Sequence, residues 1–267
     1  MSFMVGHHNQ HLAADPHSHH GVWSPPDSRA NFCEEDYAIT YYITEFINSL
    51  TNIAYVVPAL QFMYGPGSRG ILSPNLDFMS VALSGLGIGS FLFHASLRYT
   101  LEFVDELSML ILTWSMLQAC LTIRQTPGTA RLISVALTVF YIPFCTYYVY
   151  SPKIVYQVAG FSSGLVLVGL RTHYLFQWAK PSFSREEVRA WRMRGLKAIV
   201  VCLVGYLFWN IDIKYCAELR TFKAQVGLPL AWLLEFHGWW HVLTALGASQ
   251  FMQVLREMGA VEREKRQ

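Results

Sequence analysis

Charged residues are scarce in this sequence. Asp, Glu, Lys and Arg make up 14% of its 267 residues, against about 25% in a typical soluble domain. The formal net charge of +2 provides no basic field of the kind that attracts nucleic acid. Hydrophobic residues make up 53% of the chain, and its mean hydropathy is +0.28. This composition excludes an ordinary soluble enzyme, a disordered chain and a nucleic-acid-binding protein, and it predicts a polytopic membrane protein.

The first 38 residues lack an apolar run. We therefore expect no signal peptide, and we expect the first membrane helix to direct insertion. This stretch holds six of the ten histidines: His7, His8, His11, His17, His19 and His20. A tail that sequesters metal is one interpretation. A disordered, solvated lumenal tail over residues 1–30 is favoured, because nothing there fixes a coordination geometry.

Seven apolar segments follow this stretch. They lie at residues 39–64, 75–97, 101–123, 132–150, 154–178, 197–213 and 228–254. About 20 apolar residues are needed for a helix to cross a bilayer. The prediction is therefore all-α: a catalytic domain at residues 31–254 built as a bundle of seven transmembrane helices, followed by a short charged cytosolic tail at residues 255–267.

Lys and Arg are unevenly divided between the two sets of loops. The loops on the side of the C-terminus hold 13 of them, and the loops on the side of the N-terminus hold 6. Cytosolic loops carry the excess of Lys and Arg in membrane proteins. We therefore expect a cytosolic C-terminus and a lumenal or extracellular N-terminus.

The same topology sorts the five cysteines. Cys120, Cys145 and Cys202 fall inside helices, where a small apolar packing role is the usual one. Cys33 and Cys216 both fall on the lumenal side, which is oxidising. A Cys33–Cys216 disulfide is the prediction, and two free thiols are the alternative.

Polar residues inside the spans are costly and are candidates for function. Ser90 and His94 are four residues apart, so both project from one face of the second helix. Taken alone, this pair is more typical of a hydrogen bond used in packing than of a site.

His237 and His241 change that interpretation. Their i, i+4 spacing in the last segment lets both imidazoles bind one metal ion. With a helix that starts near Gly227, His237 would lie about 15 Å below the lumenal surface at the helical rise. Together with His94 they would form three nitrogen ligands with an open fourth position, as in a catalytic zinc site. The alternative is a set of histidines that only hydrogen-bond to their neighbours. A substrate that reaches such a depth is expected to be a lipid.

Acidic residues flank this region at the lumenal side. Asp105 opens the third helix and could orient or deprotonate an attacking water. Its neighbours Glu102 and Glu106, and Asp105 itself, have a simpler interpretation as solvated acids that complement the helix dipole. For Asp212, at the end of the sixth helix, we expect a structural hydrogen bond.

A second polar cluster precedes the first helix. Its residues are Asn31, Phe32, Cys33, Glu34, Glu35 and Asp36, with Glu45 inside the helix. Carboxylates and an amide in such density suit Ca²⁺. An acidic N-cap region is the alternative, although Glu45, Asn48 and Asn52 form one polar stripe within a span.

Taken together, these motifs resemble the alkaline ceramidase family, within a wider group of seven-helix membrane hydrolases that includes the adiponectin receptors. The resemblance extends from about Gly21 to Met252. Its motifs are Cys33-Glu-Glu-Asp36, Glu45-Phe-Ile-Asn48, Ser90-Phe-Leu-Phe-His94, Asp105-Glu106-Leu107, Phe208-Trp-Asn-Ile-Asp212 and His237-Gly-Trp-Trp-His241.

The resemblance implies hydrolysis of the ceramide amide to a sphingoid base and a fatty acid, in the endoplasmic reticulum or Golgi. It assigns the zinc ligands to His94, His237 and His241. It assigns Asp105 to the attacking water and to proton transfer to the leaving amine, and Ser90 to the oxyanion. It assigns a calcium site to Asn31, the Phe32 carbonyl, Glu34, Asp36 and Glu45. Asn31 stands where the family pattern has an acidic ligand, and Asp36 stands where it has an Asn.

Two other classes compete with this reading. An adiponectin-type receptor with latent hydrolase activity would need a docking surface, and the cytosolic loops and C-terminus are short. A zinc transporter would need polar residues in both halves of the bundle, and the cytosolic half is nearly all apolar. The predicted partners are therefore ceramide and the lipid bilayer.

Overall fold

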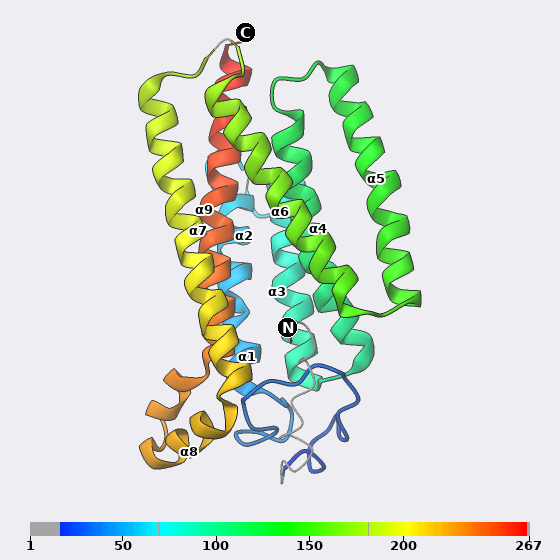
Figure 1. The fold of residues 1–267 in the computed structure, drawn as a ribbon, viewed down its shortest axis with the longest axis vertical. Coiled ribbons are helices and arrows are strands. Elements are labelled where there is room, and N and C mark those ends of the chain that lie inside the picture. Colours follow the sequence, from blue (N-terminus) through cyan, green and yellow to red (C-terminus); the bar gives the residue numbers. More distant parts are fainter. Residues whose placement is uncertain (1–16, 69, 181, 266–267) are drawn as a thin grey trace.

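The computed structural model describes residues 17–68, 70–180 and 182–265. In these ranges the regular structure is helical, without a strand. The elements are α1 (Phe46–Thr51), α2 (Ile53–Met63), α3 (Phe78–Ser96), α4 (Tyr99–Thr122), α5 (Pro127–Tyr150), α6 (Ile154–Gln177), α7 (Arg185–Lys214), α8 (Cys216–Val226), the 3₁₀ helix η2 (Leu230–Leu234) and α9 (Phe236–Glu264). The long helices run side by side, with α8 and the loop before α1 gathered at one end and the C-terminal end of α9 at the other (Figure 1).

In the described ranges, five helices are long and apolar enough to cross a membrane: α3, α4, α5, α6 and α7. Each overlaps one of the seven segments predicted from sequence, although α7 begins 12 residues before the predicted segment 197–213. The first segment instead forms two short helices, α1 and α2, that meet at Asn52. α9 has the length for a span, but His237 and His241 in its first turns and Arg256 towards its end lower its hydropathy.

Small residues bring α3 and α9 close to the α1–α2 pair. A Cβ placed on Gly87 of α3 would lie 2.8 Å from the Val56 side chain and 3.1 Å from the Asn52 carbonyl oxygen. A Cβ on Gly238 of α9 would lie 3.1 Å from Thr51. Without a side chain at these two positions the backbones approach closely, as is common between membrane helices. Helices α3 and α9, which carry the three candidate histidines, are thereby packed against the same partner.

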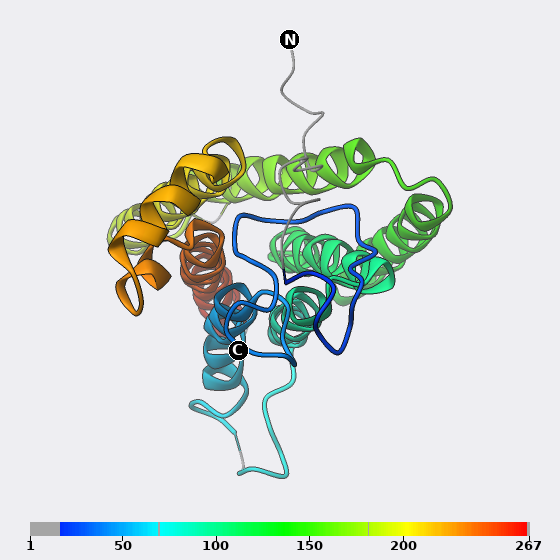
Figure 2. The ribbon, with the colours of Figure 1, turned by 90° about the horizontal axis from the view of Figure 1, so that it is seen from below.

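The segment before α1 is attached to the bundle. The backbone N–H groups of Arg29 and Ala30 donate to the Glu102 carboxylate, at 2.8 and 3.3 Å, and Asp27 accepts from the backbone of Tyr99 at 2.7 Å. Seen along the bundle, this segment crosses the end of α3 and α4 (Figure 2). The structure thus differs from a solvated tail over residues 27–30. Of the six histidines in the tail, His7, His8 and His11 lie outside the described residues.

A disulfide links the loop before α1 to α8. Cys33 and Cys216 are paired with their Cα atoms 5.2 Å apart, across a sequence separation of 183. In the chain-entropy model a bond that closes a loop of this length stabilises the fold by about 5 kcal/mol. The other three cysteines are free thiols.

The start of the last helix differs from the prediction. We expected a helix from near Gly227, but the chain leaves α8 at Gly227 with φ at +72°, passes Pro229 and the short η2, and enters α9 only at Phe236. His237 is therefore in the first turn of its helix. The prediction that His237 lies about ten residues into its helix is therefore wrong. α9 then continues to Glu264, so most of the predicted charged tail is helical.

Candidate active site

Three buried histidines meet at the end of the bundle that carries the disulfide. His94 comes from the end of α3, and His237 and His241 come from the first two turns of α9. Their ligand atoms all lie within 4.8 Å of one another. No other group of three or more His, Cys, Asp or Glu side chains in the described ranges brings its ligand atoms together in this way. The i, i+4 pair and the distant His94 thus form one cluster, as predicted.

Two of the imidazoles are oriented through their Nδ1 atoms. His94 Nδ1 is 2.5 Å from Glu45 Oε2, and His241 Nδ1 is 3.0 Å from Thr51 Oγ1. His94 Nε2 is buried and has no hydrogen-bond partner among the described residues. Metal-binding histidines typically use one ring nitrogen for the metal and the other for such an outer partner. The donor set and its orientation therefore fit a zinc ion better than histidines that only hydrogen-bond to their neighbours.

An aromatic ring closes one side of the cluster. The Phe32 ring centroid lies 3.7 Å from that of His237 and 5.2 Å from that of His94. Phe32 is itself buried. The resemblance assigns a role only to the carbonyl of Phe32. The contact of its side chain with the histidines is seen only in the structure.

Ser90 and Asp105 face each other across the contact of α3 with α4. The Ser90 side chain lies close to the Asp105 carboxylate. Gly89 permits this approach, because a Cβ there would lie 3.1 Å from Val104 and Ser108 of α4. Ser90 is buried one turn before His94, as its spacing indicates.

The neighbours of Asp105 have other partners. Glu102 is buried and accepts from the backbone before α1, as described above. Glu106 accepts from the Tyr148 hydroxyl of α5 at 2.6 Å. Glu102 is thus not a solvated acid, and that interpretation is wrong for it, whereas Glu106 is half-buried. Asp105 is the one of the three whose partner, Ser90, lies next to a histidine of the cluster.

Glu34 caps α1 from outside the helix. Its two carboxylate oxygens accept from the backbone N–H groups of Ile47 and Asn48, at 2.7 and 2.8 Å. Glu45, the residue at the N-cap position, makes no capping bond with its own side chain. Burial, and then the negative charges of Glu235 and Glu45, raise the pKa of Glu34 well above its ordinary value.

Glu45, Asn48 and Asn52 lie in and beside α1 and are buried, and Glu45 contacts the histidine cluster. Glu45 Oε1 accepts from the backbone of Phe32 at 3.2 Å, while its Oε2 contacts both His94 and Asn48. Asn52 donates to the Asn48 carbonyl at 2.8 Å. Glu45 therefore joins the loop before α1 to the histidine cluster.

The residues of the predicted calcium site lie in the same loop. Asn31 Oδ1 accepts from the adjacent Phe32 N–H at 2.8 Å, and Asp36 is buried. Glu34, Asp36 and Glu45 do not form a cluster of ligand atoms comparable to that of the histidines in the part of the chain that the structure describes. Calcium binding therefore stays a prediction.

Comparison with known proteins identifies the family. A sequence model described as Ceramidase matches residues 24–267. The chain belongs to the alkaline ceramidase family. The range that matches the family includes the histidine cluster, Ser90, Asp105 and both cysteines of the disulfide.

Relatives from animals, fungi and plants match most of the chain. Alkaline ceramidase 3 of Mus musculus is 30% identical over 232 residues, which cover 85% of this chain and 82% of the relative. An alkaline ceramidase of Saccharomyces cerevisiae is 28% identical and covers 90% of this chain and 79% of its own length. The alkaline ceramidase of Arabidopsis thaliana is 23% identical, with 85% and 82% covered.

Proposed function

We propose that this protein is a zinc-dependent intramembrane hydrolase that cleaves the amide bond of ceramide to give a sphingoid base and a free fatty acid. The observation that carries the proposal is the buried cluster of His94, His237 and His241, with Nδ1 of His94 and of His241 held by Glu45 and Thr51. Membership of the family and the names of the relatives supply the substrate class. Phytoceramide and dihydroceramide contain the same amide and are included.

The three histidines would hold zinc through ring nitrogens directed into the cluster. Zinc in this position would polarise the substrate carbonyl and make a water acidic enough to attack near neutral pH. The hydrophobic surroundings of the bundle keep bulk water out, which strengthens every electrostatic interaction inside.

Asp105 would transfer the proton, and Ser90 would stabilise the negative charge that develops on the carbonyl oxygen. Asp105 would take a proton from the attacking water and deliver it to the amide nitrogen, which leaves as the amine of the sphingoid base. The Ser90 hydroxyl, which lies against Asp105 in the structure, would donate to the carbonyl oxygen as negative charge develops there. The C–N bond breaks as the acid product and the amine form, so atoms and protons balance.

Replacing Ser90 with Ala is expected to lower the rate of ceramide hydrolysis by about 10²–10³, the effect of removing one oxyanion donor. Ser96→Ala is a matched control, because the Ser96 hydroxyl lies on the same helix and donates only to the Leu92 carbonyl of its own helix. Rates of sphingoid-base release in the two variants check this. A loss of less than about tenfold in Ser90→Ala would assign Ser90 to packing.

The proposed orientation places the active site on the lumenal side. In this arrangement the α1–α2 pair and α9 provide the first and seventh crossings beside the five candidate spans. The Cys33–Cys216 disulfide supports the placement of this end of the bundle in an oxidising compartment. The lumen of the endoplasmic reticulum or Golgi would be such a compartment. The excess of Lys and Arg at the other end supports a cytosolic C-terminus.

Calcium is proposed as a stabilising or regulatory ion at the loop before α1. The carboxylates of Glu34, Asp36 and Glu45, the Asn31 amide and the Phe32 carbonyl offer the oxygen ligands that Ca²⁺ prefers. Burial, and then the negative charges of Glu235 and Glu45, raise the pKa of Glu34, and a bound cation would offset the cost of burying these carboxylates together.

The direct test of the proposed function is turnover of a ceramide panel by the purified protein in lipid nanodiscs. We expect release of sphingoid base from at least one ceramide, and none from a phospholipid of matched acyl chains. If no ceramide is hydrolysed, the proposal is wrong and a receptor role of the adiponectin type becomes the better account.

A further inference from the structure

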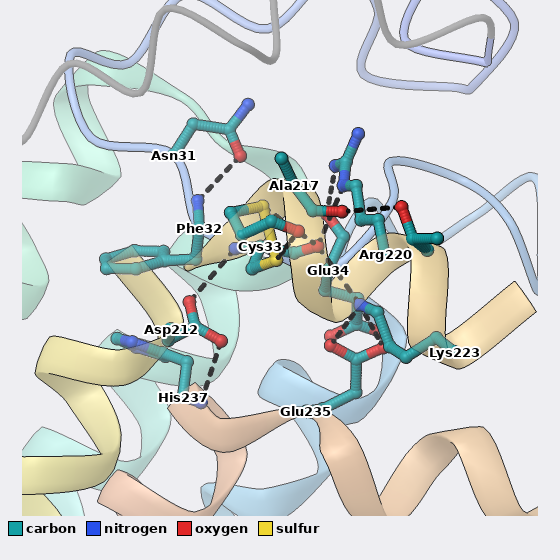
Figure 3. Close-up of a disulfide and its surroundings, with 12 residues drawn as sticks. Asn31, Phe32, Cys33, Glu34, Asp212, Ala217, Arg220, Lys223, Glu235 and His237 are labelled. Carbon is teal, nitrogen blue, oxygen red and sulfur yellow. Dashed lines mark hydrogen bonds and ion pairs between the residues drawn. A yellow bond between two sulfur atoms is a disulfide. The ribbon is translucent and has the colours of Figure 1, made fainter. Parts of the chain in front are cut away.

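Asp212 lies between two backbone segments that are far apart in the sequence. It is fully buried at the end of α7. Its Oδ2 accepts from the backbone N–H of Cys33 at 3.0 Å, and its Oδ1 accepts from the backbone N–H of His237 at 3.3 Å (Figure 3). One carboxylate therefore connects α7, the disulfide loop and a histidine of the metal cluster.

The contact with His237 supplies a cap that α9 does not provide for itself. The first N–H groups of a helix have no partner within the helix and need an acceptor. Glu235, at the N-cap position of α9, makes no capping bond, because its carboxylate is held by Lys223 Nζ at 2.9 Å. The carboxylate of Asp212 takes this place and also complements the positive end of the helix dipole.

The contact with Cys33 ties this cap to a rigid segment. The Cys33 carbonyl accepts from Arg220 Nε at 3.1 Å and from Lys223 Nζ at 3.2 Å, and its sulfur is bonded to Cys216 (Figure 3). The backbone of Cys33 is thus held at its N–H, its carbonyl and its side chain. A group that is attached to this segment has little freedom to move.

We propose that Asp212 is a positioning residue, which fixes the first turn of α9 on the disulfide loop and so sets the direction of the His237 imidazole in the metal cluster. The proposal rests on the zinc site proposed above. Glu45 and Thr51 orient the other two imidazoles through their rings. Asp212 acts on the third imidazole through the backbone N–H of His237. This N–H needs an acceptor outside α9, because His237 has only one residue of helix before it.

The test compares zinc affinities of purified variants by competition with a fluorescent chelator. Asp212→Ala is expected to lose about 10- to 100-fold in zinc affinity, the usual effect of removing an outer partner of a metal ligand. Asp212→Asn keeps the shape but can accept from only one of the two N–H groups, so a smaller loss is expected. Asn210→Ala is the matched control, since Asn210 is in the same turn of α7 and its amide bonds to the Tyr206 carbonyl. It should stay within about twofold of the wild type.

A purely structural role would lower thermal stability and leave zinc affinity unchanged in the variants that fold. That result, or an equal loss in Asn210→Ala, would overturn the proposal. If Asp212→Ala does not fold, Asp212→Asn decides between these outcomes. Wild-type protein that binds no zinc would overturn the proposed function and this inference together, whereas zinc binding that Asp212 does not affect would overturn this inference alone.

A separate measurement tests whether Asp212 positions His237 through the disulfide loop. Replacing both Cys33 and Cys216 with Ser should lower zinc affinity, because Asp212 then holds His237 to a looser segment. Asp212→Ala should cost at least about threefold less in that background than in the wild type, since the interactions are coupled. Equal costs in the two backgrounds would contradict a connection through Cys33.

Discussion

Replacing His241 with Ala is expected to abolish ceramide hydrolysis and to lower the zinc content of the purified protein. The substitution leaves two of the three nitrogen ligands, and catalytic zinc sites need three. Sphingoid-base release and zinc content by mass spectrometry measure the two effects on the same sample.

The control for this prediction is His173→Ala. His173 is exposed on α6 and contacts Trp178, which is not part of the cluster. We expect this variant to keep wild-type activity and zinc. Full activity in His241→Ala would refute the assignment of His241 to the metal, and loss of zinc in His173→Ala would show that the zinc content does not report on the cluster.

Replacing Asp105 with Asn is expected to lower kcat by about 10²–10⁴, the usual contribution of a general acid–base, while the zinc content stays unchanged. Asn keeps the size of the side chain beside Ser90, but it cannot take up and return a proton. Steady-state rates with ceramide, measured on variants with confirmed zinc content, check this.

Glu106→Gln is the matched control for Asp105→Asn. It lies next to Asp105, and a Gln can still accept from the Tyr148 hydroxyl. We expect a loss of less than about tenfold. A wild-type rate in Asp105→Asn, or an equal loss in the two variants, would show that Asp105 does not carry the proton.

The histidine cluster was predictable from the sequence because its signals are local. Spacing of i, i+4 places His237 and His241 on one helix face whatever the rest of the fold does. An imidazole inside an apolar segment identifies His94 as an unusual residue. Only the packing of α3 and α9 on the α1–α2 pair was needed to bring these residues together.

The start of α9 was not predictable from apolar composition alone. Residues 228–235 are mostly hydrophobic, and an apolar run does not distinguish a helix from the irregular chain that precedes it. Gly227 and Pro229 were the available signals, since Gly commonly ends a helix and Pro lacks the N–H that a helix interior needs. Together these two residues indicate that the last helix starts after Pro229, which places His237 near its beginning.

The caps supplied by Glu34 and Asp212 could not be found from the sequence. Each carboxylate satisfies N–H groups of a helix to which it does not belong, and Asp212 and Cys33 are 179 residues apart. Local capping patterns describe only residues next to the helix start. Such contacts depend on the packed bundle, which the sequence does not display.

Removal and return of metal ions test the central claim most directly. The purified protein is stripped with a chelator, divided, and supplied with zinc, calcium, both or neither, and its zinc content and sphingoid-base release are measured together. We predict that the stripped protein is inactive, that about one zinc per chain restores turnover, and that calcium alone raises the melting temperature without restoring turnover. Full ceramide hydrolysis by protein shown to contain no zinc would contradict the account.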